Sequence, residues 1–201
     1  MIPTVYLCSH SPRRKELLEL TGLDFEVRPL PQLDENKLLE GFDGDVPGRA
    51  KHLALEKAKV ALNLAIPGIF ITADTLVIAD DGTMLGKPRD SSEAELFLDR
   101  LAGNWHTVAT GVALSESPQA GRVQKIDSIL ETTRVKFVPM TSREIRAYIA
   151  TGEPFDKAGG YGIQGRASIY IERIEGCYFN VVGFPLHAFW KMWKRFAVQQ
   201  D

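Results

Sequence analysis

Two arginines follow a hydroxyl-rich turn near the start of the chain, in the run Ser9-His10-Ser11-Pro12-Arg13-Arg14. The run ends an apolar segment, 4–8, that predicts a buried strand, and it opens a predicted helix that Gly22 closes. Ser11 suits the N-cap and proline suits the first helical position. Acidic residues are favoured in a first turn by roughly 0.3–1 kcal/mol each, so cations there predict a bound anion. Phosphate is the natural ligand because an arginine fork grips it in a bidentate way; a solvated basic turn is the alternative.

One carboxylate, Asp74, stands between two apolar segments, 69–73 and 76–79, which read as buried strands. Burying an acid is costly unless it is paired or coordinates a cation. No glycine or proline marks a turn there, which argues against a capping or turn aspartate. Asp74 is therefore the carboxylate of this chain best suited to chemistry.

Other charged side chains stand at informative places. Lys57 falls on the apolar stripe of a helix predicted from Pro47 to about residue 65, where it either snorkels to the helix edge or faces a ligand. Lys87 lies on the stiff Gly86-Lys87-Pro88 backbone that follows a predicted hairpin turn. Two adjacent acids, Asp34 and Glu35, begin a polar loop over 33–45 and would ordinarily be solvated.

A glycine-rich stretch over 153–165 carries Asp156, Lys157 and Gln164. Glycines let the backbone approach a ligand closely, although a flexible connector has the same composition. Basic groups neutralise phosphates, and carboxylates hold a divalent cation and orient water, so this set of side chains suits a nucleoside triphosphate. The sequence has no lysine-bearing phosphate loop, dinucleotide fingerprint, nucleophile elbow or histidine metal spacing.

Composition sets the class of protein. The 201 residues are 44% hydrophobic and 25% charged, as in a soluble globular protein, and the net charge of −2 argues against a nucleic-acid partner. No apolar run is long enough to span a membrane, and no signal-peptide pattern is present. Cys8 and Cys177 lack metal spacing, which favours buried thiols in a reduced, cytoplasmic protein.

The remaining elements alternate between strands and helices. Strands are predicted over 25–28, 105–115, 123–138, 168–174 and 178–183, and helices over 90–103, over 141–152 and from about Leu186 onward. On that last helix, an aromatic stripe is expected to dock on the core: Leu186, Phe189, Trp190, Trp193 and Phe196. The whole chain, 1–201, is predicted to be one domain of two lobes, with a ribbon over 105–138 that extends the sheet.

Five motifs in this order resemble the Maf family of nucleoside triphosphate pyrophosphatases: Ser9-x-Ser11-Pro12-Arg13-Arg14, Ala73-Asp74-Thr75, Gly86-Lys87-Pro88-Arg89-Asp90, the run from Asp156 to Gly165, and Val181-Val182-Gly183-x-Pro185-Leu186. The resemblance implies an inosine-triphosphatase-like α/β fold, in which a mixed twisted sheet with flanking helices forms two lobes around a central cleft. It implies a homodimer that uses a divalent metal, Mg²⁺ or Mn²⁺, to cleave a nucleoside triphosphate into the monophosphate and pyrophosphate. It also implies a housecleaning role in the nucleotide pool; the alternative is a nucleotide-sensing binding module that regulates cell division.

The same resemblance assigns roles to residues. Asp74 matches the proton acceptor, and Ser9, Arg13, Arg14, Lys57 and Lys87 match the phosphate-binding groups. Glu35 matches a second substrate-binding acid, although Asp34 is an alternative, and Asp74 with Glu35 would hold the metal.

Specificity is assigned in the same way to Arg13, Thr75 and Gln164, whose residue types resemble the branch that acts on dTTP and UTP. A physical argument agrees, because the Gln164 amide offers an acceptor and a donor that complement the N–H and carbonyl edge of uracil or thymine. Together these assignments predict that Asp74 faces Arg13 and Lys87 across a shared cleft.

Overall fold

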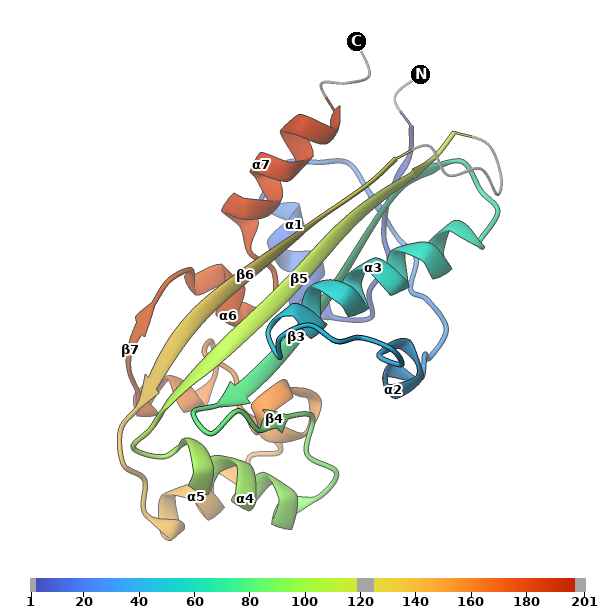
Figure 1. Cartoon of the computed structure of the whole chain (residues 1–201). Helices are drawn as coiled ribbons and strands as arrows, with labels where there is room; N and C mark the ends of the chain where they lie inside the picture. Colours follow the sequence, from blue (N-terminus) through green and yellow to red (C-terminus); the bar gives the residue numbers. More distant parts are fainter. Residues whose placement is uncertain (1–2, 119–124, 198–201) are drawn as a thin grey trace. The chain divides into compact units, whose positions relative to one another are not determined.

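The computed structural model describes residues 3–118 and 125–197, and Figure 1 labels its elements. The strands are β1 (Val5–Leu7), β2 (Glu26–Val27), β3 (Gly68–Ala79), β4 (Met84–Leu85), β5 (Trp105–Ser117), β6 (Lys125–Phe137) and β7 (Ile171–Glu175). The helices are α1 (Pro12–Glu19), α2 (Glu35–Leu38), α3 (Gly48–Leu62), α4 (Ser91–Leu101), α5 (Ser142–Ile149), α6 (Tyr178–Val182) and α7 (Leu186–Ala197). Three 3-10 helices are η1 (Glu153–Asp156), η2 (Ala158–Gly160) and η3 (Arg166–Tyr170).

The strands form a mixed sheet in the order β2-β1-β3-β5-β6-β7, with β4 paired to β3. β1 runs parallel to both of its neighbours, with Tyr6 opposite Glu26 and Phe70. β4 and β7 are antiparallel to β3 and β6 respectively. This arrangement confirms the predicted α/β class with a mixed sheet and flanking helices.

The chain divides into two compact units. Unit 1 comprises Met1–Asp74, Thr110–Glu131 and Gly183–Asp201, and unit 2 comprises Thr75–Ala109 and Thr132–Val182. The single two-lobed domain over 1–201 and its central cleft stay predictions.

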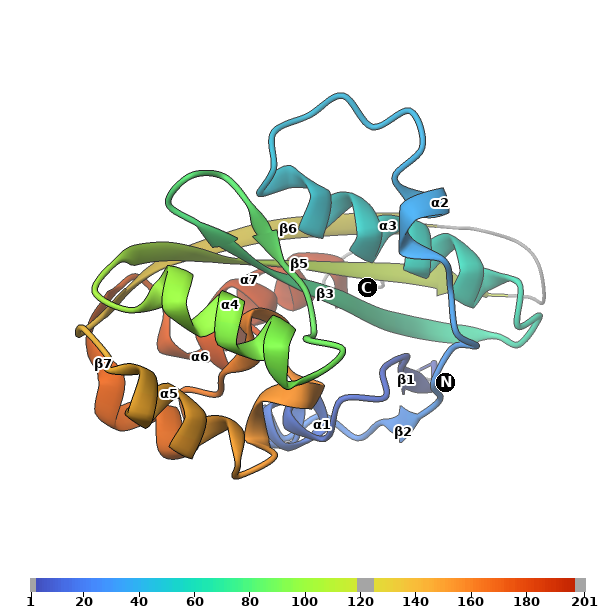
Figure 2. The same cartoon turned by 90° about the horizontal axis from the view of Figure 1, so that it is seen from below.

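In unit 1, α3 lies directly on the strands (Figures 1 and 2). The Thr72 hydroxyl of β3 donates to the Ala54 carbonyl at 2.7 Å. A Cβ added to Gly111 of β5 would lie 2.2 Å from the Ala50 carbonyl oxygen, so only glycine allows this approach. The small apolar residues of α3 thus face the strands. This close packing holds α3, which carries Lys57, against β3, which carries Asp74.

In unit 2, an apolar core joins β4, β6 and β7 to α4 and α5, which pack against each other (Figure 2). Within this core, the rings of His106, Phe137 and Tyr161 meet edge to face, with centroids 4.9 to 5.3 Å apart. The hairpin turn predicted before Gly86 is present at Gly82, and the helix predicted over 141–152 begins with a capping box between Thr141 and Glu144. Because Tyr161 belongs to this core, the glycine-rich stretch over 153–165 is anchored to it.

Several predictions about elements were wrong. In the segment predicted as a strand over 178–183, residues 178–182 form α6, because Asn180 is buried and donates to the Val108 carbonyl and the Thr133 hydroxyl, both at 3.0 Å. The predicted strand over 168–174 begins as η3 and becomes β7 only at Ile171. Asp74 lies inside one continuous strand, β3, where two were expected. The first two residues of the strand predicted over 123–138 lie outside the described residues.

The last helix also differs in detail from the prediction. Its buried side chains are Phe189, Met192 and Phe196, whereas Trp190 is 36% exposed. The side chains three and seven residues after Phe189 follow one face of the helix, and Trp190 falls outside it. No helix among residues 3–118 and 125–197 has both the length and the apolar character of a membrane span.

Candidate active site

The basic turn begins α1 as predicted, but Ser11 does not cap it. Ser11 occupies the N-cap position without a side-chain bond to the helix, and Pro12 follows at the first helical position. The Ser11 backbone N–H instead donates to the Ser9 hydroxyl oxygen at 3.2 Å. The first turn contains no acidic residue. The positive end of the α1 dipole therefore lies beside basic side chains, the arrangement expected at an anion site.

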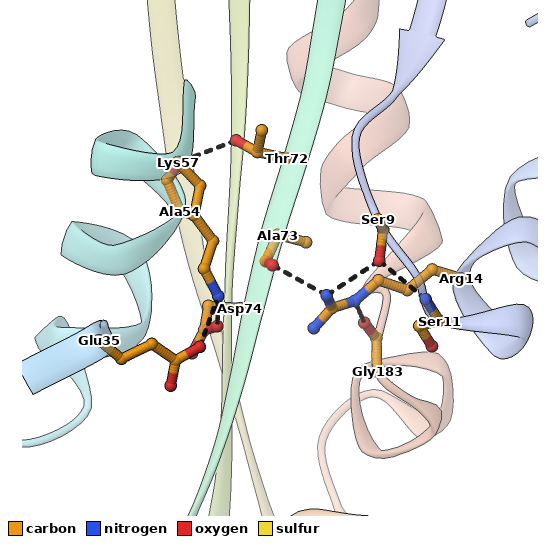
Figure 3. Close-up of polar contacts among 10 residues, drawn as sticks. All are labelled: Ser9, Ser11, Arg14, Glu35, Ala54, Lys57, Thr72, Ala73, Asp74 and Gly183. Atoms are coloured by element: carbon orange, nitrogen blue, oxygen red, sulfur yellow. Dashed lines mark hydrogen bonds and ion pairs between the residues drawn. The ribbon is translucent and has the colours of Figure 1, made fainter. Parts of the chain in front are cut away.

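The guanidinium of Arg14 donates hydrogen bonds to three neighbouring groups. Its Nη1 donates to the Ala73 carbonyl at 2.9 Å and to the Ser9 hydroxyl at 3.3 Å, and its Nε donates to the Gly183 carbonyl at 3.1 Å (Figure 3). One guanidinium thus ties α1 to β3 and to the start of the last helical segment. Burial lowers the pKa of Arg14, while the negative charge of Asp74 acts in the opposite direction.

Ser9 is only 8% exposed and accepts two hydrogen bonds, from Ser11 and Arg14. A hydroxyl has one hydrogen of its own to donate, so a Ser9 oxygen held in this way can direct that hydrogen toward an oxyanion. Arg13 is half-buried on the same turn of α1. The structure therefore brings Ser9 and Arg14 into contact and leaves Arg13 beside them on one turn.

Asp74, Lys57 and Glu35 form a second polar cluster in unit 1 (Figure 3). Lys57, in the middle of α3, donates to Asp74 Oδ1 and also to Glu35 Oε1, the latter at 2.8 Å. Asp74 is 6% exposed, whereas the Glu35 side chain is about half exposed. One ammonium group therefore joins a buried acid to an acid at the surface.

The surroundings shift the pKa of both partners upward. Burial raises the pKa of Asp74, the charge of Glu35 raises it further, and the charges of Lys57 and Arg14 offset only part of this. Burial alone would lower the pKa of Lys57, but the two carboxylates beside it raise that pKa overall. Asp74 is thus a carboxylate with an increased affinity for protons, as a general base needs.

The structure separates the roles of the two adjacent acids. Asp34 is the N-cap of α2 and accepts hydrogen bonds from the backbone N–H groups of Asn36 and Lys37 at 3.1 and 3.3 Å. Glu35, one residue later, reaches Lys57. The predicted loop over 33–45 therefore begins with a short helix, and of these two acids it is Glu35 that joins the cluster.

Asp74 and Glu35 are the two carboxylates of this cluster that are available to hold a divalent cation. In the part of the chain that the structure describes, no three side chains of His, Cys, Asp or Glu gather as a metal site. Mg²⁺ is commonly held by one or two carboxylates, with substrate phosphates and waters completing its shell. Asp74 and Glu35, which share the Lys57 ammonium, are a donor set of that kind.

The other predicted site residues belong to unit 2. Lys87 and Gln164 are both exposed, and Thr75, which follows Asp74 in β3, is half-buried. The Gly86 carbonyl accepts a hydrogen bond from the Gly159 N–H at 2.9 Å, so the Lys87 segment is fastened to the glycine-rich stretch.

Sequence reasoning gave no role to the Gly183 carbonyl that receives Arg14, nor to Glu153. The only signals in the sequence were that Gly183 belongs to the motif over 181–186 and that Glu153 lies just before the motif over 156–165.

Comparison with known proteins covers nearly the whole chain. The model of the Maf-like protein family matches residues 4–196. The dTTP/UTP pyrophosphatase of Carboxydothermus hydrogenoformans is 45% identical over 182 residues, which are 90% of this chain and 92% of that protein. The dTTP/UTP pyrophosphatase of Symbiobacterium thermophilum is 45% identical over 193 residues, 95% of this chain and 93% of that protein.

Among solved structures, the Staphylococcus aureus Ham1 protein aligns with a TM-score of 0.44 at 13% identity, over 67% of this chain and 72% of that chain. The family resemblance carried by the five motifs is confirmed by the match over residues 4–196 and by the two relatives. The chain belongs to the Maf family.

Proposed function

We propose that this protein is a nucleoside triphosphate pyrophosphatase that hydrolyses dTTP and UTP to the monophosphate and pyrophosphate. The observation that carries the proposal is Asp74, a buried carboxylate of raised pKa that shares the Lys57 ammonium with Glu35. A protein that only bound a polyanion would gain nothing from a carboxylate there, because like charges repel. Relatives at 45% identity are named dTTP/UTP pyrophosphatase, which supports the same activity.

In the proposed reaction, Asp74 accepts the proton of a water molecule that attacks the α-phosphorus in line with the leaving pyrophosphate. The bond from the α-phosphorus to the bridging oxygen breaks, and the electron pair leaves with pyrophosphate. Lys57 holds the Asp74 carboxylate in place and favours its ionised form. Ser9, Arg13, Arg14 and Lys87 bind phosphate oxygens; for Ser9 the support is its hydroxyl hydrogen, because its oxygen already accepts two bonds.

A divalent cation, Mg²⁺ or Mn²⁺, is part of the proposal, with Asp74 and Glu35 as its protein ligands. When bound, such an ion polarises phosphoryl oxygens and neutralises charge that develops on them. Glu35 suits this role because it lies at the surface end of the cluster, about half exposed, where a nucleotide-bound ion can reach it.

Base selection is proposed for Arg13, Thr75 and Gln164. The exposed Gln164 amide can donate to a carbonyl of uracil or thymine and accept from its ring N–H. A glutamate at this position would lack the donor and would favour a cationic base instead. Gln164→Glu should therefore reduce the use of dTTP and UTP relative to other triphosphates.

We also propose that the protein is a cytoplasmic homodimer without nucleic-acid or membrane partners. Two free thiols, Cys8 and Cys177, are compatible with a reducing compartment, and the net charge of −2 does not favour nucleic acid. Light scattering of the purified chain tests the dimer.

Pyrophosphate release, measured over a panel of standard and modified triphosphates with and without Mg²⁺, tests the proposed activity. The expected result is Mg²⁺-dependent release of one pyrophosphate per dTTP or UTP, strongly reduced in Asp74→Asn. Tight nucleotide binding without release would indicate the alternative, a nucleotide-sensing binding module. Release of inorganic phosphate in place of pyrophosphate would contradict the proposed bond cleavage.

A further inference from the structure

Gln164 lies in a tight turn of unit 2 that glycines open and close. The Gly165 N–H donates to the Gly162 carbonyl at 3.0 Å, and Gln164 is exposed within that turn. On the N-terminal side, Tyr161 is buried and its hydroxyl lies 2.7 Å from His106 Nε2. The chain is therefore fixed just before the turn.

The carboxylate of Glu153 fixes the chain just after it. Glu153 Oε2 accepts the Arg166 backbone N–H at 2.9 Å, and Oε1 accepts the Tyr148 hydroxyl at 2.9 Å. A Cβ added to Gly165 would lie 2.1 Å from Glu153 Oε1, so the carboxylate occupies the place where a side chain at 165 would begin. The turn is thus folded closely around one acidic group.

Tyr148 donates to that acid from a buried position on α5. Burial and the contact with Glu153 raise the pKa of Tyr148, so the phenol stays protonated and serves as a donor. Tyr148 is therefore a donor that holds the Glu153 carboxylate from α5.

Lys157 packs against the same turn and bonds to neighbouring residues. Its ammonium donates to the Glu153 carbonyl at 2.8 Å and to Asp156 Oδ1 at 2.5 Å. A Cβ on Gly162 would lie 2.7 Å from Lys157 Cε, so the lysine stem packs under the turn. The charged residues of this motif are thus bonded to one another, and the exposed amide is that of Gln164.

We propose that Glu153 is a positioning residue for Gln164, with Tyr148 as its partner, and that this pair sets the base selectivity of the enzyme. An amide that reads two groups of a base at once must be held within hydrogen-bond geometry at both, which a loose turn does not achieve. The inference rests on the proposed function of Gln164 as the base-reading group.

Glu153→Met tests the inference, because methionine has a similar length but accepts no strong hydrogen bond. Glu172→Met is the matched control, since Glu172 is an exposed residue of β7 in the same unit. Tyr148→Phe is a milder second variant that removes only one donor to Glu153. For each protein, kcat and KM are measured with dTTP, UTP and CTP, and backbone hydrogen exchange over 162–168 is measured without nucleotide.

We expect Glu153→Met to raise KM for dTTP and UTP about tenfold, with kcat changed less than about threefold. The preference for dTTP over CTP should fall by about the same tenfold factor. Exchange over 162–168 should be faster than in Glu172→Met. Tyr148→Phe should change the same quantities in the same direction by a smaller factor.

Unchanged selectivity in a folded Glu153→Met protein would overturn the inference, as would unchanged exchange over 162–168. If Glu153→Met does not fold, the same two readouts on Tyr148→Phe decide. If the wild-type protein does not hydrolyse dTTP or UTP, the proposed function fails; the exchange measurement still decides whether Glu153 holds the turn.

Discussion

Lys57 donates a hydrogen bond to Asp74 and so joins α3 to β3 through two oppositely charged, mostly buried side chains. The exposed fractions of the two side chains are 16% and 8%. Removing either charge from water is costly, and each is tolerated because the other is present. Burial and the charge of Glu35 raise the pKa of Asp74 and so favour its protonated form. The ammonium of Lys57 acts in the opposite direction.

Replacing Asp74 with asparagine keeps the size of the side chain but removes the base. We expect pyrophosphate release from dTTP to fall by about 10²- to 10⁴-fold, as when a general base is lost. Nucleotide binding, measured by calorimetry with Mg²⁺, should persist because Ser9, Arg13 and Arg14 are intact. Asp80→Asn, at an exposed position just after β3, is the control. Turnover near that of the control would remove Asp74 from its proposed role.

Lys57→Met leaves the Asp74 charge buried without its main partner. The free energy of unfolding should drop by roughly 3 kcal/mol at pH 8. When the pKa of a buried acid is higher in the folded than in the unfolded protein, the folded protein becomes less stable as the pH rises through the folded pKa. The loss of stability in Lys57→Met should therefore be smaller at pH 5, where a larger fraction of Asp74 is protonated. Urea denaturation at both pH values measures it.

Lys59→Met is the matched control for Lys57→Met, since Lys59 is exposed and pairs with Glu56 on the surface of α3. If Lys57→Met lost the same free energy of unfolding at pH 5 and at pH 8, the loss would not come from the buried charge of Asp74.

Glu35→Gln removes a negative charge that raises the pKa of Asp74. The acidic limb of the rate profile reports the ionisation of the base, so it should move to lower pH in this variant. The maximum rate should also fall, because a proposed metal ligand is lost. Profiles of kcat/KM against pH for wild type, Glu35→Gln and the exposed control Glu40→Gln measure both effects. An acidic limb that stays in place, or moves to higher pH, would show that Glu35 does not act on Asp74.

Arg14→Lys tests the guanidinium that binds Ser9 and the carbonyls of Ala73 and Gly183. A lysine has one nitrogen and cannot reproduce the fork, so at least one buried carbonyl loses its donor. We expect a loss of about 1–3 kcal/mol in unfolding free energy, measured by urea denaturation. Arg100→Lys, on the exposed face of α4 beside Asp81, is the control and should change little. If the two variants were equally stable, the hydrogen bonds of Arg14 to Ser9, Ala73 and Gly183 would not contribute to the stability of the fold.

The sequence located the buried apolar segments on both sides of Asp74, because a lone acid between apolar runs is a local signal, although it predicted two strands where β3 is continuous. It also placed Lys57 on the inner stripe of its helix. It could not show that these two side chains touch, since they are 17 residues apart and belong to different elements. Their contact depends on how closely α3 approaches the strands, which Gly111 allows.

Two features of the chain escaped prediction for different physical reasons. Residues 178–183 are rich in apolar and β-branched side chains, the composition of a strand, and became a helix through the bonds of Asn180 to residues 47 and 72 positions away. The role of Asp34 was left open because capping depends on where α2 begins, and α2 is only four residues long. The long-range hydrogen bonds of Asn180 leave no local pattern in the sequence.

β3 runs without a break through Asp74, whereas Glu35 and Gln164 stand on short segments at the surface. Moving a residue in the middle of a ladder disturbs its neighbours, while a turn can be remodelled at little cost to the rest of the chain. Substitutions in the turn of Gln164, the proposed base-reading residue, can therefore accumulate without displacing Asp74, the proposed general base. In this scaffold, reactivity and substrate choice are free to diverge separately.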